Sequence, residues 1–265
     1  MILTKPSIDP IILSLGFVDI RWYSLAYIFG FVLGSILIKF INKKSLNIIT
    51  NKQIDSFFIW SIIGIIIGGR IGYVIFYNLN TFLNNPLYII KIWEGGMSFH
   101  GGLIGIIISI LIFCKKNNIE FYYLSDLVSL AAPIGLFLGR IANFINDELY
   151  GRVTSFKFAI IYPEVDLNPR HPSQLYEALF EGIIIFSILI TYFYITKSQY
   201  KIGKISGLFL FLYGLFRFLI EYLREPDLHI GLFFNLISLG QLLSFPLIII
   251  GIVIYIKHGF EKKNN

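Results

Sequence analysis

The sequence predicts an all-α integral membrane protein with about seven transmembrane helices and a small extracytoplasmic cap. Three observations lead to this fold class. Of the 265 residues, 56% are hydrophobic and only 14% are charged, and the mean hydropathy is +0.74. A soluble domain carries about 25% charged residues, so lipid must cover much of this protein. Apolar runs also follow one another along the chain, at lengths close to the roughly 20 residues that a spanning helix needs.

The predicted spans lie at about 22–41, 56–77, 97–114, 124–146, 173–196, 205–223 and 236–257. The third run is short and rich in glycine, and the segment 79–96 before it has room for a short interfacial helix. The longest polar connection, about 147–172, is predicted to form the cap. No internal repeat or second domain is evident, so residues 1–265 are expected to form a single polytopic membrane domain.

Basic residues predict the orientation, because cytoplasmic connections collect Lys and Arg. The connections at 42–55, 115–123 and 197–204 and the tail from 257 carry eleven basic residues in total. The N-terminus and the connections at 78–96, 147–172 and 224–235 carry seven. We therefore expect the N-terminus outside and the C-terminus in the cytoplasm. No basic segment leads into a short apolar core with a cleavage site, so the first span is expected to be retained.

Charge and cysteine content exclude several classes of function. The net charge is +6, but the lysines lie in short connections between apolar runs, which favours membrane orientation over nucleic-acid binding. The single cysteine, Cys114, excludes an internal disulfide and a multi-cysteine metal site. If the chemistry needs a thiol, the substrate must supply it. The sequence has no H-E-x-x-H motif, no G-x-S-x-G motif and no Walker loop.

Charged side chains inside the apolar runs are the main functional signal. Each costs about 2.5–3.5 kcal/mol at the centre of a bilayer on insertion scales, so such residues usually face a cavity or a partner. Tyr213, Arg217 and Glu221 are spaced four apart and form a polar stripe on one helix face. The stripe is either a buried ion pair that holds the bundle together or a cationic site for a lipid phosphate, which the planar fork of arginine suits. The charged residues of the runs are Arg70, His100, Arg140, Glu177, Glu181, Arg217 and Glu221.

Polar residues at the ends of other runs also have either a functional or a structural interpretation. Arg140 and Asn143 share a face where the fourth run ends, and Glu148 follows in the loop. These residues either reach a lipid headgroup or serve as helix caps and snorkelling side chains. His100 is flanked by glycines, which let a substrate approach closely, although a lone histidine is often structural. Glu177 either belongs to a site or only neutralises a neighbouring arginine.

Six sequence blocks resemble the prolipoprotein diacylglyceryl transferase family, in family order along nearly the whole chain. They are Arg21-Trp22-Tyr23, Gly68-Gly69-Arg70-Ile71-Gly72-Tyr73, Met97 through Gly105, Gly139 through Gly151, Arg170 through Glu177, and Tyr213 through Arg224. The resemblance implies transfer of the sn-1,2-diacylglyceryl group of phosphatidylglycerol to the lipobox cysteine of a prolipoprotein, in the bacterial cytoplasmic (inner) membrane. The product is a thioether, glycerol phosphate is released, and the reaction is the first step of lipoprotein maturation.

The resemblance also implies partners and site residues. The partners are phosphatidylglycerol, prolipoprotein signal peptides with a lipobox Cys, and membrane lipid, without nucleic acid, metal or organic cofactor. His100 is the candidate base for the thiol, and Arg140 and Arg217 would stabilise charge on the leaving phosphate. The other side chains would orient the headgroup or position the arginines. The residues that match functional positions of the family are His100, Arg140, Asn143, Glu148, Gly151, Arg217, Glu221, Tyr23 and Tyr213.

Three other functions remain as alternatives at this point. A transporter or lipid scramblase would also place Arg and Glu inside a helix bundle, but such proteins often have internal repeats, and none is seen here. An intramembrane protease would need a serine or metal motif, which the sequence lacks. A purely structural subunit would not need His, Arg, Asn and Glu near one membrane face.

Overall fold

The computed structural model describes residues 3–16, 19–197, 201–226, 232–233 and 237–258. The chain divides into two compact units. One comprises Met1–Ile38 and Asp126–Asn265, and the other comprises Lys39–Ser125. Two long helices, α1 and α5, cross the boundary between them.

Helices lie at all seven predicted apolar runs. They are α1 (Trp22–Lys44), α2 (Asn51–Tyr77), α4 (Phe99–Asn117), α5 (Phe121–Ile145), the continuous segment α6–η3–α7 (Ser173–Glu177, Ala178–Ile184, Ile185–Thr196), α8 (Lys204–Ile220) and α9 (Leu239–Lys257). Short helices fill 79–96, where one was predicted: α3 (Leu79–Asn84), η1 (Pro86–Ile90) and η2 (Ile92–Glu94).

Five of the described helices are long and apolar enough to cross a membrane: α1, α2, α5, the continuous α6–η3–α7 and α9. Their outward faces carry large apolar side chains such as Ile28, Ile59 and Phe76, which are 57%, 60% and 72% exposed. A soluble monomer rarely exposes apolar patches on this scale, so lipid is the medium that covers them. The chain is therefore a multi-pass membrane protein.

Side-chain caps mark where three of these helices begin. Thr50 precedes α2 and forms a reciprocal capping box with Gln53. Ser98 precedes α4 and accepts a hydrogen bond from the backbone of Gly101. Ser238 forms a second capping box with Gln241 at the start of α9. Each cap satisfies backbone N–H groups that have no partner within the helix.

Glycines let α2 and α4 pack backbone against backbone within the second unit. On α2, a Cβ added at Gly64 or Gly68 would lie 2.7 Å from Gly105 O or 2.3 Å from Gly101 O. On α4, a Cβ added at Gly105 would lie 2.0 Å from Gly64 O. Close approach through small residues at four-residue spacing is a common way for helices to associate in lipid. The glycine content of the third run, which obscures its boundaries in the sequence, therefore has a packing role.

We expect Gly105→Ala to lower the melting temperature of the detergent-solubilised protein, because the new methyl group would meet the Gly64 carbonyl. Gly102→Ala is the matched control on the same helix. Its Cβ would lie 3.6 Å from the Ile65 side chain, an ordinary contact, so its melting temperature should stay at or above that of the native protein. Equal melting temperatures for the two variants would contradict the packing described for α2 and α4.

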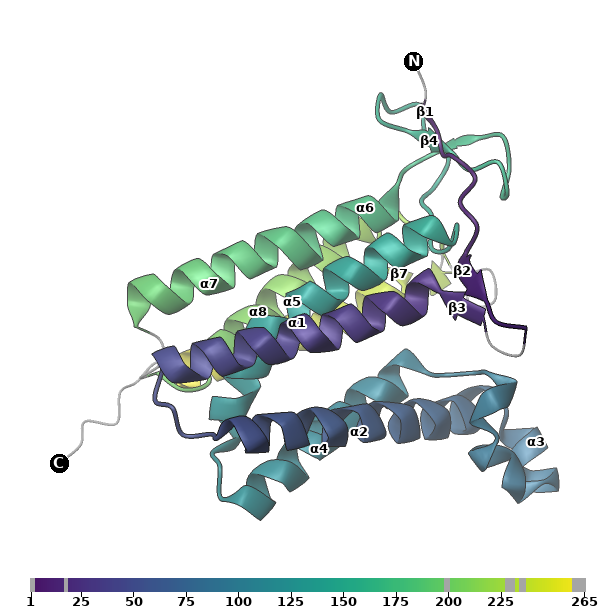
Figure 1. Ribbon diagram of the computed structural model, residues 1–265. Helices are drawn as coiled ribbons and strands as arrows, with labels where there is room; N and C mark the ends of the chain where they lie inside the picture. The colour runs from purple at the N-terminus through teal and green to yellow at the C-terminus, as the bar shows by residue number, and fades with distance from the viewer. Residues whose placement is uncertain (1–2, 17–18, 198–200, 227–231, 234–236, 259–265) are drawn as a thin grey trace. The chain divides into compact units, whose positions relative to one another are not determined.

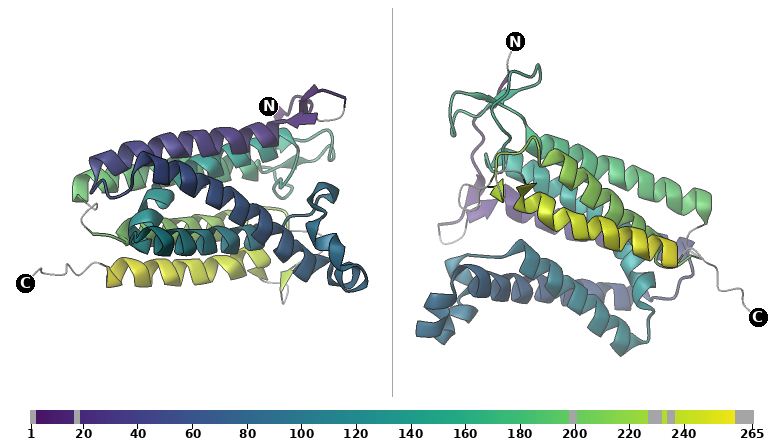
Figure 2. Two further views of the ribbon diagram at one scale, coloured as in Figure 1. Left: turned by 60° about the horizontal axis from the view of Figure 1, so that its bottom comes forward. Right: turned by 180° about the vertical axis from the view of Figure 1, so that it is seen from behind.

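In the first unit, long helices run side by side, and three small sheets lie together at one end of them (Figure 1). Figure 2 shows the same arrangement from behind, with α9 beside α8. One sheet has three strands in the order β1 (Leu3–Thr4), β4 (Ile160–Ile161), β5 (Pro169–Arg170). The other two sheets have two strands each: β2 (Ile11–Ser14) with β3 (Asp19–Arg21), and β6 (Leu232–Phe233) with β7 (Ile237–Ser238).

The connection 147–172, predicted as the cap, is folded around the buried side chain of Tyr162. The N-terminal strand β1 pairs in parallel with β4, which pairs in antiparallel with β5. Tyr162 is completely buried, donates a hydrogen bond of 3.0 Å to Gln174, and packs its ring against Phe144 and Tyr150. The N-terminal segment supplies one strand of this sheet, which the sequence does not predict.

Candidate functional site

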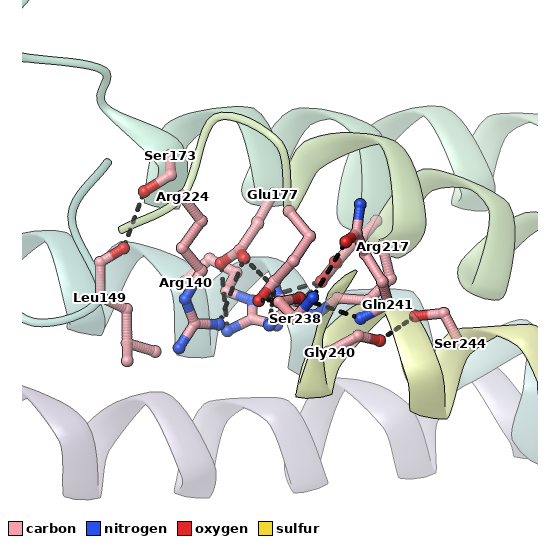
Figure 3. A network of polar contacts seen from close by, with 12 residues as sticks. Arg140, Leu149, Ser173, Glu177, Arg217, Arg224, Ser238, Gly240, Gln241 and Ser244 are labelled. Carbon is pink, nitrogen blue, oxygen red and sulfur yellow. Dashed lines mark hydrogen bonds and ion pairs between the residues drawn. The ribbon is translucent and has the colours of Figure 1, made fainter. Parts of the chain in front are cut away.

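Three arginines and three glutamates form one ion-pair network inside the helix bundle of the first unit (Figure 3). Arg140 comes from α5, Glu177 and Glu181 come from α6 and η3, and Arg217 comes from α8; Glu221 and Arg224 follow α8 directly. Glu177 lies at the centre, because all three arginines contact it. The contacts are Arg140 Nη1–Glu177 Oε2 at 3.1 Å, Arg140 Nη2–Glu181 Oε2 at 3.0 Å, Arg217 Nη2–Glu221 Oε2 at 2.9 Å, Arg224 Nη1–Glu177 Oε1 at 3.7 Å, and Arg217 Nη1 against Glu177 Oε1.

Burial differs between the two signs of charge. The side chains of Glu177 and Glu181 are 0% exposed, whereas those of Arg140 and Arg217 keep 14% and 13% exposed. The carboxylates therefore stand behind the guanidinium groups and orient them, and each arginine retains an accessible edge. A buried ion network of this kind adds little stability compared with apolar packing of the same volume. Its presence inside a membrane helix bundle therefore indicates a function rather than a contribution to folding alone.

A π-helical segment positions the two innermost carboxylates. Helix α6 passes at Ala178 into η3, which is wound as a π-helix through Ile184. Glu177, at the end of α6, and Glu181, within η3, are four residues apart and contact the same arginine, Arg140. Such insertions are uncommon in α-helices and often occur at functional sites. Nothing in the apolar pattern of the run 173–196 predicts the π-helix.

The start of α9 closes the network from another side. The hydroxyl of Ser238, the N-cap of α9, donates a hydrogen bond of 3.0 Å to Glu221. Gly240 faces the same carboxylate, and a Cβ added there would lie 2.6 Å from its Cδ. Gln241 completes the capping box with Ser238. The helix cap thus also holds one of the carboxylates that orient Arg217.

A second polar cluster lies where α5 ends. The buried amide of Asn143 donates hydrogen bonds to Glu148 Oε2, at 3.0 Å, and to Tyr23 Oη, at 3.1 Å. The backbone of the loop is held by α6, because Gln174 donates to Glu148 O at 2.6 Å and the Ser173 hydroxyl donates to Leu149 O at 2.7 Å. The amide and the carboxylate, predicted from one block, and the phenol, predicted from another, therefore form one connected chain.

Gly151 lies where this loop meets the residues after α8. It pairs with Arg224 in an isolated antiparallel bridge, and its N–H donates to His171 O at 2.9 Å. A Cβ added at Gly151 would lie 2.5 Å from His171 O and 2.7 Å from Leu223 O. Both neighbours are backbone atoms that cannot rotate away. Glycine is therefore required here for close approach of three backbone segments.

Arg170 supports the loop from the sheet side. It donates to Gly151 O at 3.2 Å and to Asp166 Oδ2 at 2.7 Å, and its guanidinium lies over the ring of Tyr150. The hydrogen bonds from Arg170 lower the pKa of the Asp166 carboxyl to about 2. Because this pKa is below the value of about 3.9 for a free Asp, the pair stabilises the fold above that value. The contribution is lost only as the pH falls through about 2.

The remaining predicted residues lie as follows. Tyr213 precedes Arg217 by one turn on α8 and stacks on Phe209. His100 is in the first turn of α4, in the second unit, and its side chain is outside the described part of the structure. Arg70 has a structural role, because its guanidinium donates to the carbonyls of Tyr88, Ile89 and Gly95 and so holds the segment of short helices together.

Sequence reasoning named Glu177 and Glu181 as intramembrane charges but left open what they contact. The structure shows that Glu177 does neutralise neighbouring arginines, and that it serves three of them. Ser238 and Gln241 were not singled out, although Ser-x-x-Gln before an apolar run is a recognisable capping signature. The ion pair of Lys5 with Asp147 has no signal in the sequence, because the two residues are 142 positions apart.

Comparisons with known proteins show what this chain is similar to. Residues 10–257 match a family model described as prolipoprotein diacylglyceryl transferase. The chain is 50% identical over 255 residues to a phosphatidylglycerol–prolipoprotein diacylglyceryl transferase of Rickettsia bellii (strain OSU 85-389), covering 96% of this chain and 97% of the relative. Proteins of the same name from Rickettsia africae (strain ESF-5) and Rickettsia typhi (strain Wilmington) are 50% and 52% identical over 94% and 93% of this chain, and over 96% and 95% of their own lengths.

Proposed function

This chain belongs to the prolipoprotein diacylglyceryl transferase family, and we propose that it transfers the sn-1,2-diacylglyceryl group of phosphatidylglycerol to the lipobox cysteine of bacterial prolipoproteins. The observation that carries this proposal is the pair of arginines, Arg140 and Arg217, held with accessible edges against fully buried carboxylates. Guanidinium groups oriented by buried carboxylates are suited to a phosphate that gains charge during a reaction.

In the proposed step, the thiolate of the substrate attacks the glyceryl carbon that bears the phosphate. A C–S bond forms, the C–O bond to phosphate breaks, and glycerol phosphate leaves with the bonding electron pair. The thiol proton passes to a base. Arg140 and Arg217 would stabilise the phosphate oxygens, and Asn143 and the Tyr23 hydroxyl would orient the headgroup. Glu221 would position Arg217, and Glu148 would hold the Asn143 amide.

Helix α8 supports the proposal of seven spans. At 17 residues it is about 26 Å long, slightly less than a typical hydrocarbon core. Its first residues bind the buried Asp126 carboxylate near the start of α5, through the N–H groups of Gly203 and Ser206 at 2.7 and 2.8 Å. Near its other end, Arg217 contacts Glu177, which also contacts Arg140 near the end of α5. A helix that runs the length of α5 in this way crosses the membrane with it.

The polar network lies at the end of the first unit's helix bundle that holds the cap, and the cap is one of the connections expected outside because together they carry fewer basic residues. We therefore place the site at the extracytoplasmic side of the cytoplasmic membrane, with the N-terminus outside and the C-terminus in the cytoplasm. This side suits a substrate whose cysteine follows an exported signal segment.

The function is tested by mixing purified protein with phosphatidylglycerol and a lipobox peptide, and weighing the peptide by mass spectrometry. A mass increase equal to one diacylglyceryl group, absent when the peptide Cys is replaced by Ser, is the expected result. An unchanged peptide mass, while a known active transferase modifies the same peptide in a parallel reaction, would reject the proposed activity. That result would favour the alternative function, a transporter or lipid scramblase.

His100 is proposed as the base that takes the thiol proton. We expect His100→Gln to lower the turnover rate by about 100-fold or more, since general-base catalysis contributes about 10²–10⁴-fold, with little change in phosphatidylglycerol binding. The rate and the lipid affinity are measured separately, the second by titration with a labelled lipid. A variant with near-native turnover and unchanged affinity would remove His100 from this role.

A further inference from the structure

Lys5 is a buried lysine whose place in the fold the ion-pair network does not explain. Lys5 is the one buried lysine among the residues that the structure describes, and its side chain is 1% exposed. A buried ammonium is unfavourable unless its charge is paired and its hydrogen bonds are made. The N–H of Lys5 donates to Ile161 O at 2.9 Å, next to the pairing of β1 with β4. The backbone of Lys5 is thus anchored in the sheet while its side chain reaches elsewhere.

The side chain of Lys5 ends at the C-terminus of α5. Its Nζ donates to Ile145 O at 3.0 Å and to Asp147 Oδ2 at 2.9 Å, and lies 5.7 Å from the centre of the Phe144 ring. Carbonyl groups at the end of a helix have no partner within the helix, and a cation there also interacts favourably with the helix dipole. Lys5 therefore caps α5 from a strand far away in the sequence.

The loop that Lys5 holds has an unfavourable backbone conformation. Asp147 and Leu149 have φ values of +56° and +57°, in the left-handed region that favours glycine. A non-glycine residue in this region is strained and persists where its surroundings enforce the conformation. Glu148 lies between them, and its carboxylate accepts the Asn143 hydrogen bond. From the α6 side the loop is held by Ser173 and Gln174, and at Asp147 it is held by Lys5.

We propose that Lys5 is a positioning residue, which acts through Asp147 to keep the loop 146–151, and with it Glu148 and Asn143, in the conformation that lines the lipid-headgroup site. The inference rests on the proposed function, because it assigns the N-terminal strand a part in that site. Lys5 itself contacts no reacting group. Strand β1 thus connects the sheet of the cap to the end of α5 through Lys5.

Lys5→Met is the first test, because Met keeps the length of the side chain without its charge. We expect kcat/KM for phosphatidylglycerol to fall by about tenfold or more, since small displacements of positioning groups have large effects on rate. Amide hydrogen exchange of peptides covering 146–151 should become faster, while peptides from α2 and α4 stay unchanged. Lys91→Met is the matched control. It removes a lysine from an exposed ion pair with Glu94, and both readouts should stay native.

A rescue experiment separates positioning from general stability. Lys5→Met/Asp147→Gly should return to within about twofold of the native kcat/KM, because Gly adopts a positive φ without strain and no buried charge is left alone. Lys5→Met/Asp147→Ala should not recover, since Ala removes the same charge but keeps the strain. This comparison is informative even if Lys5→Met alone does not fold.

Several results would overturn the inference: native kcat/KM in Lys5→Met, failure of the Asp147→Gly rescue, or equal rescue by Gly and Ala. A failure of the proposed function gives a different result. In that case the wild-type protein transfers no diacylglyceryl group, while the hydrogen exchange of 146–151 still reports whether Lys5 holds the loop.

Discussion

Arg217→Lys should lower kcat/KM for diacylglyceryl transfer by about 100-fold or more. Removing one preorganised donor from a site that stabilises developing negative charge costs about 10²–10³ in rate. Arg217 contacts Glu177 and Glu221 at once, which fixes the plane of its guanidinium while part of it stays accessible. A lysine ammonium keeps the positive charge but cannot reproduce the planar fork that binds two phosphate oxygens. The rate is measured by following lipobox-peptide mass over time.

This exchange also separates the two interpretations of the polar stripe. If Arg217 only holds the bundle together by pairing with Glu221, a lysine can still pair and the rate should remain within a few-fold of native. If it binds the phosphate, the rate falls while the melting temperature stays close to native. Arg21→Lys is the matched control, because Arg21 is exposed on β3 and outside the network; its rate should be native. A native rate in Arg217→Lys would reject bidentate phosphate binding.

Gly151→Ala should abolish most of the activity, with a loss of about 100-fold, although the change adds a single methyl group. The added Cβ would lie 2.5 Å from His171 O and 2.7 Å from Leu223 O, so the loop after α5 must separate from the residues after α8. That separation displaces Glu148 on one side and Arg224 on the other. The loss should therefore appear in kcat/KM, measured with the same peptide assay, more than in the yield of folded protein.

The control for this prediction is another glycine of the same unit. Gly135 lies in the middle of α5, and a Cβ added there would meet nothing within 4 Å. Gly135→Ala should keep the native rate and a native or slightly higher melting temperature, because Ala favours helix over Gly. If Gly151→Ala also kept the native rate, close backbone approach at this junction would not be needed for transfer.

The ion-pair network and the loop after α5 depend on each other in this picture. Arg224 contacts Glu177 in the network and pairs with Gly151 at the loop. A disturbance at either place therefore reaches the other through one residue. The effects of Arg217→Lys and Gly151→Ala are expected to be less than additive in the double variant, because both remove the geometry of the same site.

Much of this molecule could be predicted from the sequence alone. The helices lie at the predicted runs because each run must bury its backbone in lipid, and a helix satisfies every backbone group within the segment. Apart from His100, whose side chain is not described, the charged residues inside these runs have partners as expected, because an isolated charge in a bilayer is too costly. Arg140 and Arg217 stood out for this reason.

Only the tertiary structure decided which partner each charge has. Glu177 could have paired with any arginine on any neighbouring helix, and the packing of α5, α6 and α8 brings three to it. Among the described residues, five of the seven predicted spans are long and apolar enough to cross a membrane, and α4 and α8 are the other two. Helix α8, at 17 residues, is shorter than its predicted run.

Lys5 marks where the sequence stops being informative. It precedes the first apolar run in a segment without periodicity, and nothing local distinguishes it from an exposed lysine. It is buried because β1 pairs with β4, which brings it to the end of α5 beside Asp147. The sequence by itself determined which segments are helical and where charge enters the membrane, because both follow from the chain's local interactions with lipid. Contacts between residues more than 100 positions apart were decided by the fold.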